Sequence, residues 1–537
     1  MTLSRIRGSA RTRFLAVAVA SALVVPLAML GGSAAAVTHP RVPDAAKAPN
    51  VTVVMGTTDR IVSADPAGSY DLPSWTIIWN VYQTLVKYPP GSTKIVPDAA
   101  TCAWKGSGAT VYVCTLLPNQ YFSNGDPVTG QDVVYSFERI NKINDPNGPE
   151  SLISAMKSVT ASGNTVTFTM KYPAATWPDV LTTGAGAIVD AKVFPFNKLQ
   201  PDAKIVGSGP YELQSYTPNQ LAVFVPNPHY GGTDVFSNNK FIIRYEESAA
   251  TLVSDVQQGA VDIAYRVLAP TDLLALQKSH GVSIVVGKGI EIRYIAFNLK
   301  VMPGSTPAQK LAVRQAVAYL VNRQDIATNV YHGSVTPAYS IIPNVLPGHI
   351  NSFATVYGTS PNVAKAKAVL AAAGVTTPLK FTLWYNVNHY ADTDLATELQ
   401  RQLDASGLFD VSLQTAEWST YITSETTSQY GVALMGWFPD YPDADDYTGP
   451  FYGCTNFLND HYCNAAVTKG IMQEEGSTVA SVRDVAFSAV QIQTAKDAPL
   501  VPLWQGGQWA AQHGKVTGLA STLDPSYIFR FWLIGKS

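Results

Sequence analysis

Carboxylates and aromatic rings alternate in one short stretch of the chain, residues 436–452. Three prolines and Gly449 prevent a continuous helix there, and the apolar run at 431–435 reads as a buried strand. Carboxylates attract positive charge and rings cover apolar surface, so this loop suits a partly apolar ligand that carries an amine. A solvated acidic turn is the alternative. The charged and aromatic members are Asp440, Asp443, Asp445, Asp446, Trp437, Phe438, Tyr441, Tyr447, Phe451 and Tyr452.

The sequence holds no recognisable catalytic motif. HExxH, GxSxG, Walker A and strand-linked GxGxxG patterns are all missing, and none of the eight histidines stands four residues from another. Asp443 together with Asp445 or Asp446 could in principle serve as the acid and base of a glycosidase. We predict that the protein is not an enzyme and has no catalytic residues, cofactor or metal, with a secreted hydrolase as the alternative.

The N-terminal segment, residues 1–36, has the three parts of an export signal. A basic region carries four arginines, residues 14–30 are apolar, and residues 34–36 are three alanines suited to cleavage. Because the first cysteine is Cys102, no lipid-anchor motif occurs, and no twin-arginine pair is present. We predict a protein exported to the periplasm, the cell-wall space or the medium, with an uncleaved membrane anchor as the alternative.

Charge and length narrow the class further. The chain has a net charge of −2, and the predicted leader accounts for four arginines and no acids, so the mature part carries −6. A mildly acidic surface argues against nucleic acid or anionic lipid as the main partner. A mature chain of about 500 residues exceeds one hydrophobic core, so two or more lobes are expected.

The four cysteines form two local pairs. Cys102 and Cys114 flank two strand-like runs around a Gly-Ser-Gly turn, and Cys454 and Cys463 close a second short loop. An exported chain meets oxidising conditions, so we predict two disulfides, each stabilising the fold by about 3 kcal/mol. A zinc site is the alternative, which the spacing disfavours because it is not CxxC.

Short strand-like runs alternate with helical segments along the chain, which predicts α/β lobes. We expect helices at 76–85, 131–140, 251–258, 308–321, 362–373 and 395–406, and strands at 51–55, 165–170, 212–216, 381–385, 411–414 and 431–435. Thr129 is placed to cap the second helix, and a glycine follows three of the others. The βαβ-like series at 362–414 reads as one compact lobe, and the first half of the chain as another.

Six segments with distinctive sequences follow one another along the chain: residues 64–71, 121–139, 206–211, 258–263, Asn298 with 313–319, and 436–441. The second contains a glycine turn, a capping threonine and a helix, the third a GSGPY turn, and the sixth a GW-x-x-DY loop. In this order they resemble family 5 of the extracytoplasmic solute-binding proteins of ABC importers, the oligopeptide, dipeptide and nickel group. The resemblance runs from about Val51 to the C-terminus.

The resemblance implies an α/β, two-lobe periplasmic-binding-protein-like fold of type II, with an extra subdomain inserted in lobe I. Two strands would join the lobes, near 291–298 and 500–508. Carried onto this chain, the parts are a signal peptide at 1–36, lobe I at 37–78, 204–295 and 504–537, the inserted subdomain at 79–203, and lobe II at 296–503.

The resemblance also points to a binding site. In peptide-binding members the aspartate of the GW-x-x-DY loop pairs with the α-amino group of the ligand, which assigns that role to Asp440 and the role of a wall to Trp437. A loop-shaping role is the alternative for Asp440, and the other three aspartates of the loop are expected to shape the turn or face water. The full set of predicted ligand-binding residues is Asp440, Trp437, Asn298, Trp384, Asn386, Trp504 and Tyr82.

Two departures from the family bear on the ligand. Tyr82-Gln83 stands where many members have a Tyr-Glu pair, and residues 384–390 offer no Arg or Lys to meet the carboxylate of a dipeptide. We therefore expect a longer peptide or an oligosaccharide, and the lack of a clear cluster of metal ligands argues against nickel. The resemblance implies a monomer that closes on its ligand and delivers it to ABC permease subunits driven by a cytoplasmic ATPase. A sensor or adhesion module that binds without transport is the alternative.

Overall fold

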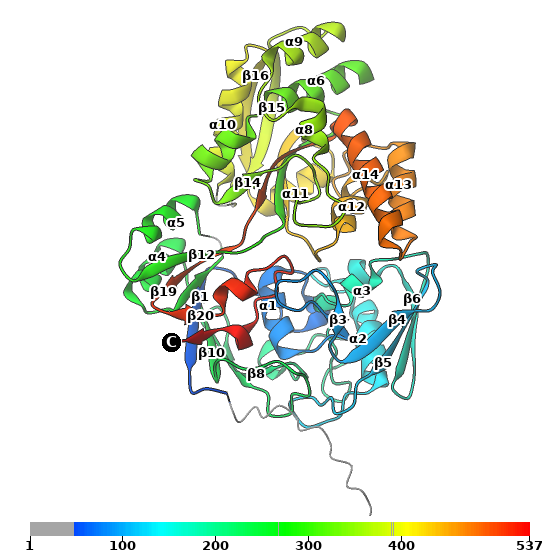
Figure 1. Cartoon of the computed structure of the whole chain (residues 1–537), viewed down its shortest axis with the longest axis vertical. Coiled ribbons are helices and arrows are strands. Elements are labelled where there is room, and N and C mark those ends of the chain that lie inside the picture. Colours follow the sequence, from blue (N-terminus) through cyan, green and yellow to red (C-terminus); the bar gives the residue numbers. More distant parts are fainter. Residues whose placement is uncertain (1–47, 267, 388, 390) are drawn as a thin grey trace, which may run out of the picture. The chain divides into compact units, whose positions relative to one another are not determined.

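The computed structural model describes residues 48–266, 268–387, 389 and 391–537 (Figure 1). The predicted signal peptide, residues 1–36, lies outside the described residues. Three sheets of four or more strands organise the described part of the chain, and each is the centre of one part, called lobe I, the inserted subdomain and lobe II below. No helix within the described ranges is long and apolar enough to cross a membrane.

Lobe I is built on a seven-stranded sheet. Its strands are β1 (Thr52–Thr57), β8 (Tyr211–Thr217), β9 (Leu221–Pro226), β10 (Lys240–Tyr245), β11 (Ile263–Tyr265), β12 (Val282–Val286) and β19 (Trp509–His513), with helices α1 (Leu72–Val81), α4 (Ala249–Gln258), α5 (Pro270–Gln277) and α15 (Leu519–Thr522). The strand order is β12-β19-β11-β1-β10-β9-β8. β1 pairs in parallel with β10 and β11, and its alternate residues Val53 and Met55 are buried, as the apolar pattern predicts.

The inserted subdomain has a four-stranded antiparallel sheet. It consists of β4 (Ala100–Trp104), β5 (Val111–Leu116), β6 (Met156–Ser162), β7 (Thr165–Met170), α2 (Gly130–Ile143) and α3 (Trp177–Val180). Thr129 and Asp132 form a capping box at the start of α2, which confirms the predicted helix start. The predicted disulfide between Cys102 and Cys114 is present and joins directly paired residues of β4 and β5.

Lobe II is built on a six-stranded sheet with helices on its flanks (Figure 1). Its elements are β13 (Glu291–Phe297), β14 (Val335–Pro337), β15 (Leu379–Asn386), β16 (Phe409–Ala416), β17 (Val432–Trp437), β18 (Leu500–Gly506), α6 (Pro307–Leu320), α7 (Arg323–Asp325), α8 (Ser352–Tyr357), α9 (Val363–Ala372), α10 (Asp392–Ala405), α11 (Trp418–Thr426), α12 (Gly449–Tyr452), α13 (Ala465–Glu475) and α14 (Ala480–Asp497). The strand order is β14-β18-β13-β17-β15-β16. β15, α10 and β16 form the predicted βαβ unit, in which the two strands pair in parallel.

Shorter elements complete the fold. They are β2 (Val86–Lys87), β3 (Val96–Pro97), β20 (Val516–Thr517), β21 (Gly535–Lys536), the 3-10 turns η2 (Pro66–Gly68), η3 (Glu150–Ile153), η4 (Gly184–Gly186), η5 (Asp202–Lys204), η7 (Ala444–Tyr447) and η8 (Phe531–Leu533), and the π turn η6 (Ile326–Val330). One predicted helix has different bounds in the structure: the helix predicted at 76–85 is α1, which runs from Leu72 to Val81. Asp71 caps its N-terminus by accepting a hydrogen bond from the backbone N–H of Ser74 at 2.8 Å, which starts the helix earlier than its apolar pattern indicates.

The chain passes between the two large sheets at residues 287–290 and 507–508. β13 and β18 lie next to these crossings in the sequence and pair antiparallel inside the lobe II sheet. The lobe boundaries that the resemblance implies, after residues 295 and 503, fall within those strands.

Glycine makes the first crossing narrow. An ideal Cβ placed on Gly287 would lie 2.0 Å from the carbonyl oxygen of Leu523. One placed on Gly289 would lie 2.2 Å from the carbonyl oxygen of Gly506. The crossing backbone is therefore packed too closely against its neighbours for any side chain at these two positions.

A buried ion pair joins the inserted subdomain to lobe I. Arg139 on α2 donates to the two carboxylate oxygens of Asp65 at 2.7 and 2.5 Å, and both side chains are almost fully buried. The same carboxylate accepts hydrogen bonds from the backbone N–H groups of Ala67 and Gln200. Asp65 and Arg139 belong to the first two segments that carry the family resemblance, so in this chain those residues hold two parts of the fold together.

Candidate ligand-binding cleft

A cavity of about 910 Å³ lies where side chains of lobe I, the inserted subdomain and lobe II meet. Lobe I contributes Tyr70 and the start of α1, the inserted subdomain contributes residues including Tyr172 and Trp177, and lobe II contributes β17 with the loop that follows it. This volume is within the range of cavities that hold small organic ligands. The acidic, aromatic loop that the sequence singles out therefore lies along a cleft.

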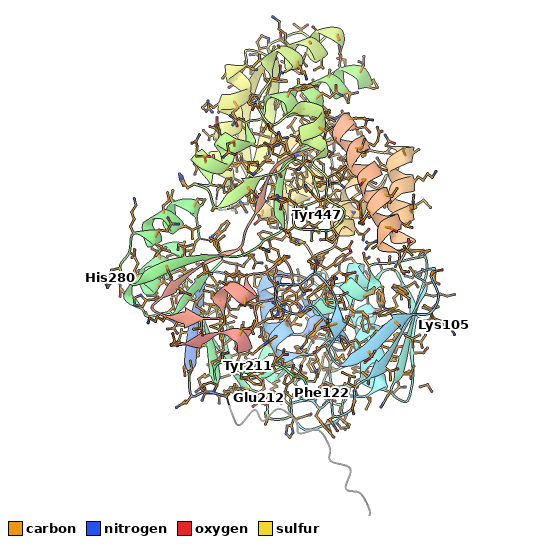
Figure 2. The ribbon with its side chains drawn as sticks, in the orientation of Figure 1. Lys105, Phe122, Tyr211, Glu212, His280 and Tyr447 are labelled. Carbon is orange, nitrogen blue, oxygen red and sulfur yellow. A yellow bond between two sulfur atoms is a disulfide. The ribbon has the colours of Figure 1, made fainter. Side chains whose placement is uncertain are left out.

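The loop at 436–452 is held in place at both ends. Tyr447, labelled in Figure 2, is fully buried and donates from its hydroxyl to the carbonyl oxygen of Ile290 at 2.6 Å, which ties the loop to the first crossing. At the other end, an ideal Cβ on Gly436 would lie 1.7 Å from Nη1 of Arg293. Glycine at this position therefore leaves the space that the arginine side chain occupies.

Asp446 organises the loop from inside. Its Oδ2 accepts hydrogen bonds from the indole Nε1 of Trp437 at 2.9 Å and from the backbone N–H of Asp440 at 3.0 Å. The side chain is almost fully buried, and burial together with the charge of Asp440 raises its pKa well above the usual range. Asp446 thus fixes the predicted wall and the predicted anchor relative to each other, which agrees with the turn-shaping role expected for it.

Asp440 projects into the cleft from lobe II. It is half-buried, and its Oδ2 accepts a hydrogen bond from the hydroxyl of Tyr70 in lobe I at 2.6 Å. Burial raises the pKa of Asp440 to about 7, although the hydrogen bond from Tyr70 lowers it. A carboxyl group in this state is near the point of ionisation at neutral pH, so an arriving cation would favour the charged form.

Exposed aromatic rings gather in this cleft. Five rings are exposed and line it: Tyr70, Tyr172, Trp418, Phe438 and Phe457. Elsewhere in the described part of the chain, Tyr121 and Phe196 are the remaining exposed rings. Grouped exposed apolar surface marks a binding site more often than scattered single residues do. The cleft is therefore built to contact apolar groups as well as charge.

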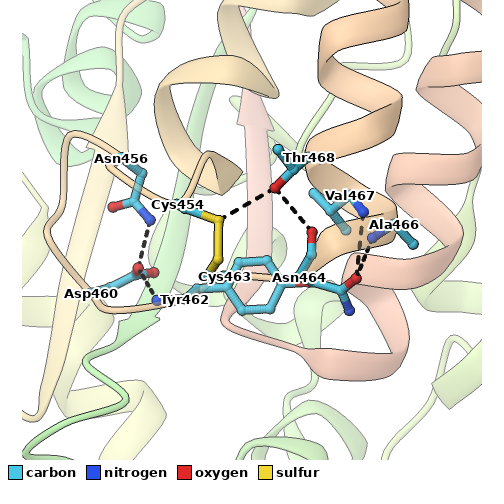
Figure 3. The surroundings of a disulfide bond; sticks show 9 residues. All are labelled: Cys454, Asn456, Asp460, Tyr462, Cys463, Asn464, Ala466, Val467 and Thr468. Atoms are coloured by element: carbon cyan, nitrogen blue, oxygen red, sulfur yellow. Dashed lines mark hydrogen bonds between the residues drawn. A yellow bond between two sulfur atoms is a disulfide. The ribbon is translucent and has the colours of Figure 1, made fainter.

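The second predicted disulfide, drawn in Figure 3, closes the loop that contains one of these rings. Cys454 and Cys463 are bonded, which confirms the prediction, and they close a loop that contains Phe457. Within this loop, Asp460 Oδ1 accepts hydrogen bonds from Asn456 Nδ2 at 2.6 Å and from a backbone N–H at 2.9 Å. The ring of Phe457 lies 6.1 Å from that of Trp437, so the disulfide-closed loop extends the aromatic wall.

Two arginines also line the cleft, although the sequence analysis found no basic partner for a ligand carboxylate. Arg266 lies with its Nε 2.6 Å from Asp59 Oδ2 and its guanidinium carbon 5.2 Å from the centre of the Phe438 ring. Its charge is therefore matched by a carboxylate and by an aromatic face. Arg266 is more than 100 residues away from 384–390 in the sequence, so the sequence of that segment does not indicate it.

Arg293 is surrounded by other charged groups. Its Nε lies 3.5 Å from Asp392 Oδ1 and its Nη2 lies 3.8 Å from Glu291 Oε1, while His389 Nδ1 lies 2.9 Å from the same oxygen of Asp392. Burial raises the pKa of Asp392, but the charges of Arg293 and His389 outweigh burial and hold that pKa below the usual range. Charged residues inside β13, a strand that is buried along its whole length, are the sequence signal that could have identified this cluster.

The structure brings three of the predicted ligand-binding residues to the cleft. Asp440, Trp437 and Asn386 line it. Asp445 also lines it and is buried, so of the two roles expected for this aspartate, shaping the turn or facing water, burial is compatible with the first. Tyr390 and Asn388, in the polar segment singled out beside Asn386, lie outside the described residues.

The other four predicted residues are not among the described residues that line this cavity. Two pack against other rings: Trp504 against Tyr331 with ring centres 4.7 Å apart, and Trp384 against Tyr430 at 4.2 Å. The other two donate hydrogen bonds to backbone carbonyl groups, Tyr82 Oη to Ala64 O at 3.1 Å and Asn298 Nδ2 to Asn459 O at 3.2 Å. A tryptophan near the end of a strand can face either the core or a cleft, and its sequence neighbours do not decide which. Ligand contact by these four stays a prediction.

Asp443 has a different environment from the other aspartates of the loop. Its two carboxylate oxygens accept hydrogen bonds from Nη1 and Nη2 of Arg483 at 2.9 and 2.6 Å, and Oδ1 also accepts from the backbone N–H of Asp445. It is absent from the described residues that line the cavity. A carboxylate engaged in this way cannot readily act as the acid or base that the hydrolase alternative requires.

Comparison with known proteins gives a consistent result. The family described as bacterial extracellular solute-binding proteins, family 5 Middle, matches residues 94–459. The chain is 26% identical over 494 residues to the probable D,D-dipeptide-binding periplasmic protein DdpA of Escherichia coli (strain K12), covering 88% of this chain and 92% of DdpA. It is 27% identical over 476 residues to the periplasmic murein peptide-binding protein MppA of the same organism, covering 83% and 86%.

A solved structure shows the same fold. The unliganded open form of the MppA periplasmic murein tripeptide binding protein superposes with a TM-score of 0.76 at 23% identity, covering 91% of this chain and 98% of MppA. The predicted α/β fold of the two-lobe binding-protein type is confirmed.

Proposed function

This chain belongs to family 5 of the bacterial extracellular solute-binding proteins, and we propose that it captures a peptide-like ligand with a free amine and delivers it to the permease of an ABC importer. The observation that carries this proposal is the position of Asp440, a half-buried carboxylate in a cleft lined with exposed aromatic rings. DdpA and MppA are named as peptide-binding proteins, which supports a peptide as the ligand class.

The chemistry of the anchor suits an ammonium group. A hydrogen bond between an ammonium and a carboxylate is roughly twice as strong as a neutral one, and it gains further strength where water is excluded. The pKa of Asp440, about 7 in the free protein, would fall when a cation arrives, because the opposite charge stabilises the ionised form. Binding of the amine and ionisation of Asp440 would then occur together.

Contacts from both sides of the cleft would link binding to closure. Tyr70 and Arg266 belong to lobe I, whereas Trp437 and Asp440 belong to lobe II, and all four line the cavity. A ligand that touches both lobes binds the closed form better than the open form and therefore shifts the equilibrium towards it. The closed form would be the one that docks on the permease, with the cytoplasmic ATPase supplying the energy for uptake.

The charge of the cleft favours a peptide over an oligosaccharide. The described lining contains six carboxyl groups against two arginines and one histidine: Asp71, Asp392, Asp440, Asp445, Asp446 and Glu475. A neutral sugar would leave buried carboxyl groups without a charged partner, which costs free energy, whereas an amine supplies one. The aromatic rings would suit either ligand, so the preference for a peptide is supported by the carboxyl groups alone.

A binding experiment tests the proposal. Trialanine and N-acetyl-trialanine differ at the amine and would be titrated calorimetrically into protein freed of co-purified ligand. We expect the free-amine peptide to bind about 10- to 100-fold more tightly, because a hydrogen bond to a charged group contributes roughly 1.5–3 kcal/mol. Asp440→Asn should remove most of this difference.

The controls separate the alternatives. Asp410→Asn removes an exposed carboxylate on β16 that pairs with Lys380 at 3.0 Å, and it should leave both affinities unchanged. Equal binding of the two peptides by the wild type would contradict the role of Asp440. Steady release of alanine during the titration would support the hydrolase alternative instead. Uptake that persists after the neighbouring permease genes are deleted would favour a sensor or adhesion role.

A further inference from the structure

We propose that the cleft contains a second cation site, formed by Asp445 and Glu475, that takes a basic side chain of the ligand. The inference rests on the proposed function, because an amine held at Asp440 determines where the side chains of a peptide would lie. It adds to that function a substrate class, namely peptides that carry a lysine-like or arginine-like side chain in addition to their terminal amine.

Asp445 is a buried carboxylate with unused bonding capacity. It is 7% exposed and lines the cleft. Its Oδ1 has no hydrogen-bond partner among the described residues. Its Oδ2 has two long contacts, 3.3 Å from Thr176 Oγ1 and 3.4 Å from Tyr441 Oη. Buried polar groups in folded proteins are almost always hydrogen-bonded, so this carboxylate lacks a donor that a ligand could provide.

Glu475 faces the same space. It is the last residue of α13, it is half-buried, and it lines the cleft. An ideal Cβ on Gly449 would lie 3.6 Å from Asp445 Oδ1 and 3.4 Å from Glu475 Oε1. Both oxygens therefore lie within van der Waals contact of the position that a side chain at Gly449 would take. The C-terminal end of a helix carries partial negative charge, which further favours a cation at this point.

The surroundings supply more negative than positive charge. From lobe II, Asp443 and Glu474 face this region, with Glu474 accepting a hydrogen bond from Thr448. From the inserted subdomain comes Asp179, whose carboxylate accepts a hydrogen bond from Tyr88. Arg483 is the cation that acts on these groups, and it already makes two hydrogen bonds to Asp443. One arginine therefore cannot neutralise the whole group.

The titration of the two carboxyl groups is consistent with a missing cation. Burial raises the pKa of Asp445 to about 6, with the charge of Asp443 adding to the effect. Burial also raises the pKa of Glu475 to about 7, with the charge of Asp445 adding to it. Without a ligand cation both groups hold protons near neutral pH more readily than free carboxyl groups do.

The shape and lining favour an organic cation over a metal ion. No group of three or more His, Cys, Asp or Glu residues within the described ranges could hold a metal ion. The neighbouring lining contains Tyr172, Pro173 and Trp177 from the inserted subdomain. Apolar surface of this kind suits the methylene stem of lysine or arginine, whose charged end would then reach the two carboxylates.

Six tripeptides test the site. They are Lys-Ala-Ala, Ala-Lys-Ala and Ala-Ala-Lys, and the same three peptides with norleucine in place of lysine, which keeps the length of the stem and removes the charge. Their affinities would be measured calorimetrically at pH 7.5 for the wild type, Glu475→Gln, Asp445→Asn and the control Glu138→Gln. Glu138 is an exposed glutamate on α2, outside the described lining of the cleft.

We expect the wild type to prefer lysine over norleucine by about 10-fold or more in at least one of the three positions. The preference should fall below about 3-fold in Glu475→Gln and in Asp445→Asn, and should persist in Glu138→Gln. Glu475→Gln keeps the shape of a half-buried side chain, so the comparison does not depend on the deeper substitution.

Three outcomes would overturn the inference, and they can be told apart. Binding of all six peptides without a lysine preference, or a preference that both variants retain, would remove the second cation site and leave the proposed function standing. Failure of all six to bind, with the terminal amine free in each, would contradict the proposed function itself and the second site with it.

Discussion

Asp65 and Asp445 are both buried aspartates, yet they differ in how their charge is used. Asp65 accepts two hydrogen bonds from Arg139 and two more from backbone N–H groups. Asp445 has two long contacts and one oxygen without a partner in the described structure. The first carboxylate is satisfied by the protein alone, and the second is not. The difference separates charge that holds the fold together from charge that is available to another molecule.

This comparison predicts that substitutions in the two regions affect different quantities. Removing one member of a satisfied buried pair leaves the other charge without a partner, so the loss appears in the free energy of unfolding. Removing a carboxylate that lacks a partner relieves a cost of the free protein, so the loss appears in ligand affinity. Stability and affinity measured on the same variants therefore test the distinction.

The largest expected effect is that of Arg139→Ala on stability. The free energy of unfolding should fall by about 3–5 kcal/mol, because Asp65 would remain buried and charged without its partner. Urea unfolding followed by circular dichroism measures this loss. Lys192→Ala, which breaks the more exposed pair with Asp126 at 2.9 Å, should cost far less, because solvent screens an exposed pair. Similar losses in the two variants would refute the structural role of the buried pair.

The two disulfides offer an intermediate test of the same distinction. Replacing Cys102 and Cys114 with serine, or Cys454 and Cys463 with serine, should lower the free energy of unfolding by about 2–3 kcal/mol in either case. Affinity for trialanine should fall, by about 3- to 10-fold, in the second variant alone, because its loop carries Phe457 in the cleft wall. Calorimetric titration of both variants measures the difference, and equal affinities would show that the loop needs no disulfide to position the ring.

The smallest expected effect is the pH dependence of the ligand-free protein. Folding raises the pKa of Asp440 to about 7, of Asp445 to about 6 and of Glu475 to about 7. A carboxyl group with a raised folded pKa binds its proton more tightly in the folded state, so its contribution is greatest at low pH and is lost as pH rises through that pKa.

Between pH 5 and pH 8 the free energy of unfolding should therefore fall by roughly 1–3 kcal/mol, a modest amount because Asp440 and Glu475 are partly exposed. Urea unfolding at several pH values measures this slope. Asp440→Asn should make the slope shallower, and a bound lysine-containing peptide should do the same by stabilising the ionised carboxylates. A stability that rises steadily between pH 5 and pH 8 would contradict the assignment of these groups.

Local sequence rules predicted much of the fold. Thr129 caps α2 as expected, and the βαβ unit of β15, α10 and β16 follows from alternating strand and helix periodicity. The cysteine pairs could be predicted because each pair is close in the sequence. In all these cases the decisive interactions join residues that are near one another along the chain.

The remaining features depend on contacts between distant segments. Arg293 reaches the cleft through the space left by Gly436, which is more than 100 residues away in the sequence. The burial of Asp445 depends on the inserted subdomain, which provides Thr176. No periodicity or spacing within a segment reports such contacts, so the sequence identified the acidic loop but could not show which of its aspartates would lack partners.

The two short crossings limit how the lobes could move relative to each other. In the proposed closure, the two short connections at 287–290 and 507–508 would serve as the hinge, with rotation about the line joining them. The arrangement of the lobes is then described by one angle. Tyr447 links the binding loop to Ile290 at the axis of that rotation. Under the proposed function, the permease would therefore distinguish the ligand-bound form from the empty form by this one angle, whatever the side chains of the ligand.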